Sequence, residues 1–162
     1  MKKNAEEYLF YEAIKYLGKY PATKKKIENF LQSKIRNKKI QQKIIFPENI
    51  DKNLILENII NKLDNLNIIN ESYYLESMFD YYLRSLFSIN KIKNKLYQKG
   101  FNKNEIDDYI TLRLKDDHEL EIEILKKYII KKNLSHLESI DLKKKLYQQG
   151  FSENSIYKII KE

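Results

Sequence analysis

A twelve-residue stretch that occurs twice constrains the fold of this chain more than any other feature. KLYQKGFNKNEI begins at Lys95, and KLYQQGFSENSI begins fifty residues later at Lys145. Both copies share a Leu-Tyr-Gln-x-Gly-Phe centre. Glycine is the residue that most readily takes the left-handed conformation that ends a helix. We therefore expect each copy to end one helix and begin the next.

The position of Gly100 in the first copy determines which helix-end positions its neighbours occupy. With Gly100 just past the end of the helix, Leu96 and Phe101 fall at the two positions whose apolar side chains touch in a Schellman motif. Asn102 then becomes the N-cap of the following helix, and Glu105 three residues later completes a capping box.

The second copy repeats this arrangement with Leu146, Gly150 and Phe151, and Ser152 becomes the N-cap. Neither copy contains a nucleophile or a set of metal ligands. We interpret both as structural joints between helices, and each cap contributes about 1 kcal/mol.

Apolar residues follow helical spacing almost throughout the chain, which has only three Gly and two Pro. We expect an all-α protein of nine helices in three groups of three, forming an elongated and modestly curved array of tandem repeats. The predicted repeats are residues 1–69, with an insertion at about 37–53, then 70–115 and 116–162. Thr23 and Ser88 are expected N-caps, and the insertion is predicted to be a helix extension followed by an irregular loop.

Composition excludes several classes of protein. The chain has no cysteine, so disulfides and thiolate metal sites are excluded, and a reducing compartment is compatible with this. No apolar run is long enough to cross a bilayer, and the N-terminal residues do not form a signal peptide. We expect a cytoplasmic protein. The net charge of +8 favours an anionic partner, although codon bias toward lysine is an alternative source of that charge.

The joints and the helix triplets around them resemble the RecX family of recombinase regulators, which is built from tandem three-helix repeats. The segment LDNLNIINESYYLESMFDYYLRS resembles the start of that family's second repeat, and the spacing from Tyr74 to Leu96 also fits. Four places depart from the family pattern. Asn70-Glu71 stand at its acidic pair, Leu75 replaces its usual small residue, its Gly-x-Gly-Pro entry is replaced by residues 86–89, and Ile35-Arg36 stand at the first joint. We therefore expect a remodelled first joint.

The resemblance implies a monomeric, non-catalytic regulator that needs no cofactor. Such a protein binds RecA filaments on single-stranded DNA, lies along the filament groove and lowers recombinase and coprotease activity. Direct contact with single-stranded DNA is a further implication. Two alternatives remain open at this stage: a basic helical DNA-binding module without recombinase specificity, and a generic helical scaffold.

Lysine-rich helices are the candidate contact surfaces for the partner. Lys91, Lys95 and Lys99 recur at every fourth residue and form a stripe along one helix. The complete candidate set for partner or DNA binding is Lys24, Lys25, Lys26, Arg84, Lys91, Lys93, Lys95, Lys99, Lys143, Lys144 and Lys145. The alternative interpretation of these residues is a solvated surface enriched by codon bias.

Thirteen tyrosines could also stack on nucleic-acid bases. Helical spacing instead predicts core or half-buried packing for Tyr8, Tyr11, Tyr74, Tyr81 and Tyr109. Tyr97 and Tyr147 are expected to pack between helices with their hydroxyl groups exposed. The two histidines, His118 and His136, lack metal-ligand spacing, and no phosphate loop or nucleophile motif occurs, so we expect neither a metal site nor an enzyme.

Overall fold

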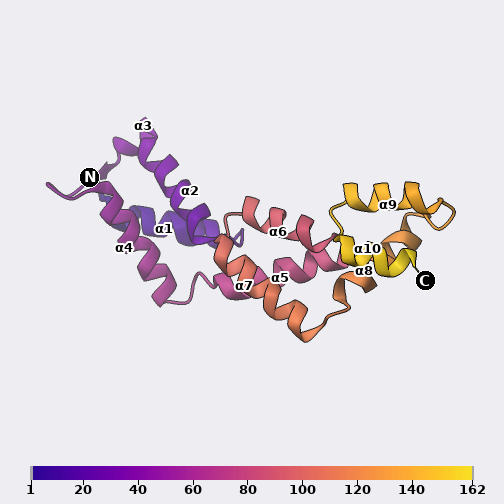
Figure 1. Cartoon of the computed structure of the whole chain (residues 1–162). Coiled ribbons are helices and arrows are strands. Elements are labelled where there is room, and N and C mark those ends of the chain that lie inside the picture. Colours follow the sequence, from indigo (N-terminus) through magenta and orange to yellow (C-terminus); the bar gives the residue numbers. More distant parts are fainter. Residues whose placement is uncertain (1, 162) are drawn as a thin grey trace. The chain divides into compact units, whose positions relative to one another are not determined.

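The computed structural model describes residues 2–161 and is almost entirely helical (Figure 1). This confirms the all-α fold class. The elements in chain order are β1 (Lys3–Asn4), α1 (Ala5–Leu17), α2 (Lys24–Arg36), α3 (Lys38–Gln41), β2 (Ile44–Ile45), α4 (Lys52–Asn65), α5 (Glu71–Arg84), α6 (Ile89–Gln98), α7 (Lys103–Asp116), α8 (Leu120–Lys131), α9 (Ser139–Gln148) and α10 (Glu153–Ile160).

The chain forms two compact units, residues 1–74 and residues 75–162. Each unit has a hydrophobic core of its own. The division into three repeats, 1–69, 70–115 and 116–162, remains a prediction, as does the curved array. Nevertheless, α5–α7 and α8–α10 share two kinds of helix end: α5 and α8 end at a non-glycine residue with positive φ, and α6 and α9 end at a glycine with positive φ.

The core of the first unit is formed by α1, α2 and α4. On α1 the fully buried row is Ala5, Leu9 and Ala13, which are four residues apart and therefore lie on one face. Tyr11 lies on the opposite face with 61% of its surface exposed, and Tyr81 of α5 is 55% exposed. The prediction of core or half-buried packing is therefore wrong for these two tyrosines, because Ala5, Leu9 and Ala13 occupy the packed face of α1, and Leu75, Phe79 and Tyr82 occupy that of α5.

The other tyrosine predictions have mixed outcomes. Tyr8, Tyr74 and Tyr109 are half-buried, which confirms the prediction for these three. Tyr97 and Tyr147 are exposed to 60% and 43%, so they lie on the surface of their helices rather than between helices. Each lies one residue past the buried leucine of its joint, and this single step of about 100° turns the ring toward solvent.

The 37–53 segment is more ordered than an irregular loop. Asn37 ends α2 in an extended conformation, and its side-chain oxygen accepts hydrogen bonds from the amides of Lys39 and Ile40. It thereby starts the short helix α3 instead of extending α2. Strand β2 then pairs in parallel with β1, and the Lys3 amide donates to the Lys43 carbonyl at 2.9 Å. The segment was difficult to predict because its strand partner lies forty residues earlier.

Both Leu-Tyr-Gln-x-Gly-Phe joints have the predicted Schellman geometry. Gly100 has φ = 96° and Gly150 has φ = 84°, both in the left-handed region. Each glycine amide donates to the carbonyl of the tyrosine of its own joint at 2.9 Å. The phenylalanine amides of the two copies donate to the Leu96 and Leu146 carbonyls at 3.4 and 3.3 Å.

The first residues after each joint also cap as expected. The side chain of Asn102 accepts from the Asn104 amide, and that of Ser152 accepts from the Ser155 amide. No hydrogen bond joins Glu105 back to the Asn102 amide in the described part of the chain, so the predicted capping box does not form. Thr23 and Ser88 are confirmed as N-caps.

Three further helices end in the same way without glycine. Asn67, Leu86 and Asn133 have φ of 53°, 59° and 51° and follow α4, α5 and α8. The amide after each donates to a carbonyl five residues earlier: Ile68 to Leu63, Phe87 to Tyr82 and Leu134 to Ile129. By contrast, Gly18 ends α1 with an ordinary φ of −65°. Glycine content therefore underestimates how often this chain uses the left-handed helix end.

Two glutamates fifty residues apart contact the N-terminus of an earlier helix. Glu71, at the start of α5, accepts from the Lys24 amide of α2 at 2.7 Å. Glu121, near the start of α8, accepts from the Ile89 amide of α6 at 3.4 Å and from the Ser155 hydroxyl at 2.7 Å. A carboxylate at the positive end of a helix is electrostatically favourable. We call Glu71 and Glu121 the clamp glutamates.

The second joint is also a contact site for α6. Ser88 is 1% exposed, and its hydroxyl donates to the Gln149 carbonyl at 2.8 Å. The Asn90 amide group donates to the Gly150 carbonyl at 2.9 Å. A Cβ on Gly150 would lie 3.0 Å from the Ser88 oxygen, so glycine is required there both for its φ and for space.

Candidate partner-binding surface

The lysine stripe of α6 is largely engaged within the protein. The Lys91 ammonium lies 4.8 Å from the centre of the Phe87 ring and donates to the Gln149 side chain at 3.2 Å. Lys95 lies 5.1 Å from the same ring and 5.7 Å from that of Tyr82. Ammonium groups over aromatic faces gain cation–π stabilisation. These two lysines therefore cover the hydrophobic end of α5.

The other two lysines of α6 are also half-buried. Lys93 forms an ion pair with Asp107 of α7, and Lys99 is the C-cap of α6, directly before Gly100 in the first joint. Spacing predicted a common stripe, and its members Lys91, Lys95 and Lys99 are half-buried in the structure.

The lysines at the start of α2 separate into two kinds. Lys24 pairs with Asp64 of α4 at 2.8 Å, while its backbone amide donates to the clamp glutamate Glu71. Lys25 and Lys26 are exposed. Because Lys24 ties α2 to α4 and α5, it belongs to the structure of the first unit.

On α9, Lys143 lies 5.9 Å from the Tyr157 ring of α10, whereas Lys144 and Lys145 are exposed. Arg84 at the end of α5 is exposed as well. Of the predicted set, five residues remain exposed and have no ion pair within residues 2–161: Lys25, Lys26, Arg84, Lys144 and Lys145.

Arg113 was not predicted and has a structural role. Its guanidinium contacts Asp80 at 3.2 Å, donates to the Tyr109 hydroxyl at 3.0 Å and lies 5.2 Å from the Phe79 ring centre. Burial opposes the charged form of Arg113, but the Tyr109 hydrogen bond and the Asp80 charge outweigh it and raise the pKa of Arg113. This cluster joins α5 to α7.

A small groove lies beside the first joint between α6 and α7. It has a volume of about 310 Å³ and is lined by Lys93, Asn94, Tyr97, Lys103 and Ile106. Within it, Lys93 is paired with Asp107, and Lys103 is exposed.

The structure places a second set of exposed cations around α3 and the β1–β2 pairing: Lys2, Lys3, Arg36, Lys38, Lys39 and Lys43. The candidate set from the sequence does not include them. Between Glu28 and Glu48 the chain has five Lys or Arg residues and no acidic residue. That asymmetry was the available signal. It was missed because the predicted loop gave no reason to expect the side chains on one surface.

No helix within residues 2–161 combines the length and apolar character needed to cross a bilayer. The same residues contain no cluster of three or more potential metal ligands. His118 and His136 are both exposed.

Two solved structures share this fold along almost the whole chain. A crystal structure of RecX from Lactobacillus salivarius aligns with a TM-score of 0.75 and 24% identity, covering 97% of this chain and 95% of that one. A crystal structure of a regulatory protein RecX aligns with a TM-score of 0.69 and 23% identity, covering 97% and 71%. No protein-family model matches the sequence, and no curated protein matches it. The fold expected from the resemblance is thus confirmed.

Proposed function

We propose that this protein is a RecX-type regulator that binds RecA filaments on single-stranded DNA and lowers their recombinase and coprotease activity. The observation that carries the proposal is the match of fold over 97% of the chain to two proteins named RecX. The proposed protein acts without catalysis, as a monomer, in the cytoplasm where such filaments form.

The exposed cations of the second unit supply the proposed contact surface. Lys144 and Lys145 extend from α9 without an ion pair among the described residues, and Arg84 does the same at the end of α5. Cations of this kind raise the rate of association with an acidic partner and help to select it. The half-buried lysines of α6 instead hold the second unit together.

The direct test is the ATPase activity of RecA on single-stranded DNA, measured with and without this protein. We expect a decrease that saturates with added protein. Unchanged activity at several-fold excess of the protein over RecA would disprove the proposal.

The variant Lys144→Glu/Lys145→Glu tests the surface. It is expected to weaken the effect on the ATPase, because two attractive charges become repulsive. Lys131→Glu/Lys132→Glu changes the net charge equally within the same unit and is the matched control. An equal loss in both variants would assign the effect to total charge rather than to α9.

The rival function is binding of naked DNA without recombinase specificity. Neutralisation of phosphates makes affinity fall steeply as salt rises. Tight, salt-dependent binding to naked DNA together with no effect on RecA would favour this rival.

A further inference from the structure

We propose that the start of α6 and the second joint form a releasable latch, and that α8–α10 swings away from α5–α7 as one body when the latch opens. The latch consists of Ser88, Asn90 and Lys91 on one side and Gln149 and Gly150 on the other. Figure 1 shows α8, α9 and α10 grouped together and joined to α7 by a short connection. The latch lies within the second unit and goes beyond the proposed regulation of a recombinase.

The hydrogen bonds across the latch are polar contacts that water can replace. The Ser88 hydroxyl donates to the Gln149 carbonyl at 2.8 Å. The Asn90 amide group donates to the Gly150 carbonyl at 2.9 Å, and the Lys91 ammonium donates to the Gln149 side chain at 3.2 Å. Because water satisfies the same donors and acceptors after they separate, one such bond favours the closed form only about fivefold. The latch can therefore open without leaving these groups unpaired.

The charged groups beside the latch keep partners of their own when it opens. Glu121 of α8 accepts from the Ile89 amide of α6 at 3.4 Å, and more closely, at 2.7 Å, from the Ser155 hydroxyl of its own helix group. The bond that breaks is therefore the longer of the two. On the other side, Lys91 stays over the Phe87 ring, 4.8 Å from its centre, because both residues belong to the α5–α7 group.

The α8–α10 group has a core that opening does not disturb. Its fully buried side chains include Leu125, Leu146 and Ile156, one from each helix of the group. Leu83 and Leu86, at the end of α5, also pack against this core and are partly buried. Apolar contact is non-directional, so these two leucines can turn against the core while the directional hydrogen bonds of the latch break. They are the pivot of the swing.

The connection between α7 and α8 is the hinge. The C-cap of α7, Asp117, is extended, with φ = −137° and ψ = 90°, and residues 115–119 are exposed. Glu119, the N-cap of α8, makes no side-chain cap hydrogen bond among the described residues. Hinges are short loop stretches that absorb changes in φ and ψ. This connection can change its backbone angles without breaking a side-chain cap of α8.

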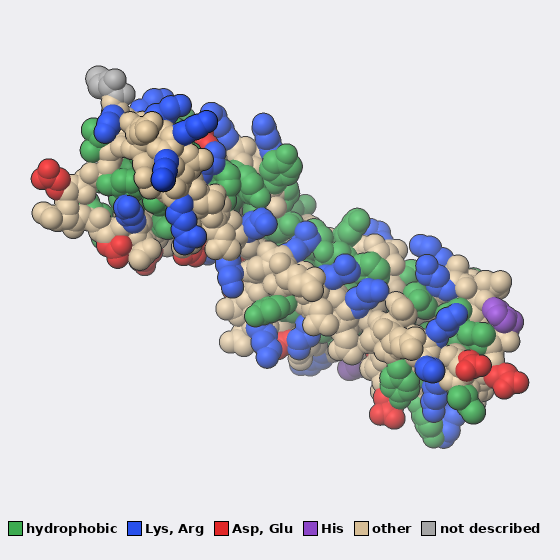
Figure 2. Space-filling view, turned by 90° about the horizontal axis from the view of Figure 1, so that it is seen from above, with side chains coloured by type: hydrophobic (Ala, Val, Ile, Leu, Met, Phe, Trp, Pro, Cys, Tyr) green, Lys and Arg blue, Asp and Glu red, His purple; other side chains and the backbone are tan. Residues whose placement is uncertain are grey.

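Opening changes the spacing of the exposed cations of the second unit. Arg84 belongs to α5, whereas Lys144 and Lys145 belong to α9. Lys and Arg side chains occur along the whole face that Figure 2 shows, so they are not confined to one helix group. The latch therefore lets one chain present the same charges at two spacings.

The test uses the absence of cysteine from the chain, because two introduced cysteines then carry labels at known positions only. Nitroxide labels at Asn94→Cys in α6 and Gln148→Cys in α9 occupy exposed positions on opposite sides of the latch. Double electron–electron resonance on the full chain measures the distribution of the distance between the labels. We expect a main population at a short distance and a minor one at a longer distance.

The variant Asn90→Ala/Gln149→Ala removes two hydrogen bonds of the latch and keeps the Ser88 N-cap in place. We expect the ratio of the long-distance to the short-distance population to rise about tenfold. The control Gln98→Ala/Asn104→Ala removes the same two kinds of side chain from exposed positions outside the latch, and the ratio should not change. A single distance in both the wild type and the latch variant would overturn the proposal. An equal change in the control would overturn it too.

A second pair of labels tests whether the group moves as one body. Lys132→Cys and Gln148→Cys are exposed positions that both lie within α8–α10. We expect one distance between them, with and without the latch substitutions. If this distance broadens together with the distance across the latch, the group unfolds locally instead of swinging, and the proposal is wrong.

The outcomes separate this proposal from the function proposed above, since the label distances are measured without RecA. Protein that shows the swing but does not affect the RecA ATPase contradicts only the regulator. Protein that inhibits the ATPase but has one fixed distance across the latch contradicts only the latch.

Discussion

The two Leu-Tyr-Gln-x-Gly-Phe joints have nearly the same backbone and different surroundings. At Gly100 and at Gly150 the φ angles differ by only 12° (96° − 84°), and the amide-to-carbonyl distances agree within 0.1 Å. The second joint, however, receives Ser88 and Asn90 from the start of α6. Beside the first joint lies the open groove that Tyr97 lines. Both joints turn the chain, and the second joint also holds the α8–α10 group to the start of α6.

The difference shows that local sequence determines the end of a helix but not what packs on it. The left-handed glycine and the two flanking apolar residues act within six residues of chain. Ser88 and Gln149 lie sixty-one residues apart, and no pattern around either residue indicates the contact. The same motif can therefore have different importance for stability in its two copies.

The largest effect is expected from removing the clamp glutamate next to the second joint. Glu121→Ala leaves the Ile89 amide and the Ser152 and Ser155 hydroxyls without their carboxylate. We expect a loss of about 3 kcal/mol in the free energy of unfolding, measured by urea denaturation. Glu71→Ala is the matched control: Glu71 is half-buried rather than buried, so we expect about half that loss. Equal losses in the free energy of unfolding would show that the burial of Glu121 does not increase its contribution to stability.

The next effect compares the two glycines directly. Alanine in a left-handed conformation costs about 1 kcal/mol, which is the expected loss for Gly100→Ala. At Gly150 the new Cβ would also press on Ser88, which is buried and bound to the Gln149 carbonyl and so cannot easily move. We expect about 2 kcal/mol for Gly150→Ala, again from urea midpoints. A Gly100 variant as unstable as the Gly150 variant would contradict the distinction between the joints.

A smaller difference is expected at the N-caps that follow the joints. Asn102→Ala removes a cap and should cost about 1 kcal/mol. Ser152→Ala removes a cap together with the hydroxyl that donates to Glu121, so we expect about 1.5 kcal/mol. In the background of Glu121→Ala, the cost of Ser152→Ala should fall to that of a simple cap. Strict additivity of the two changes would exclude coupling between them.

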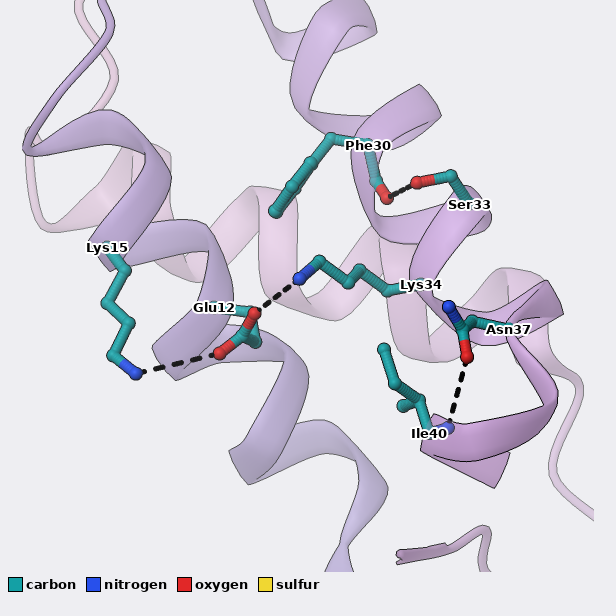
Figure 3. A network of polar contacts seen from close by, with 7 residues as sticks. All are labelled: Glu12, Lys15, Phe30, Ser33, Lys34, Asn37 and Ile40. Atoms are coloured by element: carbon teal, nitrogen blue, oxygen red, sulfur yellow. Dashed lines mark hydrogen bonds and ion pairs between the residues drawn. The ribbon is translucent and has the colours of Figure 1, made fainter. Parts of the chain in front are cut away.

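The smallest effect concerns α2, whose end lacks the glycine of the two joints. An ion pair between Glu12 and Lys34 holds α2 to α1 there, and Lys34 lowers the pKa of Glu12 (Figure 3). Because the folded pKa is depressed, the stabilisation is present above the ordinary glutamate pKa and is lost as pH falls through the folded value. We expect less than about 1 kcal/mol. Lys34→Gln should reduce the pH dependence of stability below pH 5, since Schellman hydrogen bonds join backbone groups that do not titrate.

Sequence reasoning was most successful where the physics is local. The Schellman positions of Leu96, Gly100 and Phe101 follow from chirality and one turn of helix, and the structure has them. The burial prediction was wrong for Tyr11 and Tyr81, because helical spacing identifies a face without showing which of two apolar faces packs. The pairing of β1 with β2 at Lys3 was not predicted, because a pairing of two residues carries no periodicity.

The candidate site was less predictable than the fold. Spacing identified the α6 lysines correctly as neighbours, but burial of Lys91 and Lys95 over Phe87 depends on a ring that only tertiary packing brings near. The exposed lysines at the β1–β2 pairing, Lys3 and Lys43, come from both ends of a forty-residue stretch. A lysine is equally common in both settings, so composition alone cannot separate a partner-facing lysine from a structural one.

The fifty-residue offset between the clamp glutamates equals the offset between the two joints. A duplicated segment of that length would carry both a carboxylate that binds the helix start of the preceding copy and a helix start that binds the carboxylate of the following copy. A tandem copy would therefore pack on the first copy through contacts that both already have. Growth by gene duplication then needs no new interface. The start of α9 has no side-chain cap among the described residues, and it is the position at which the clamp of another such copy would attach.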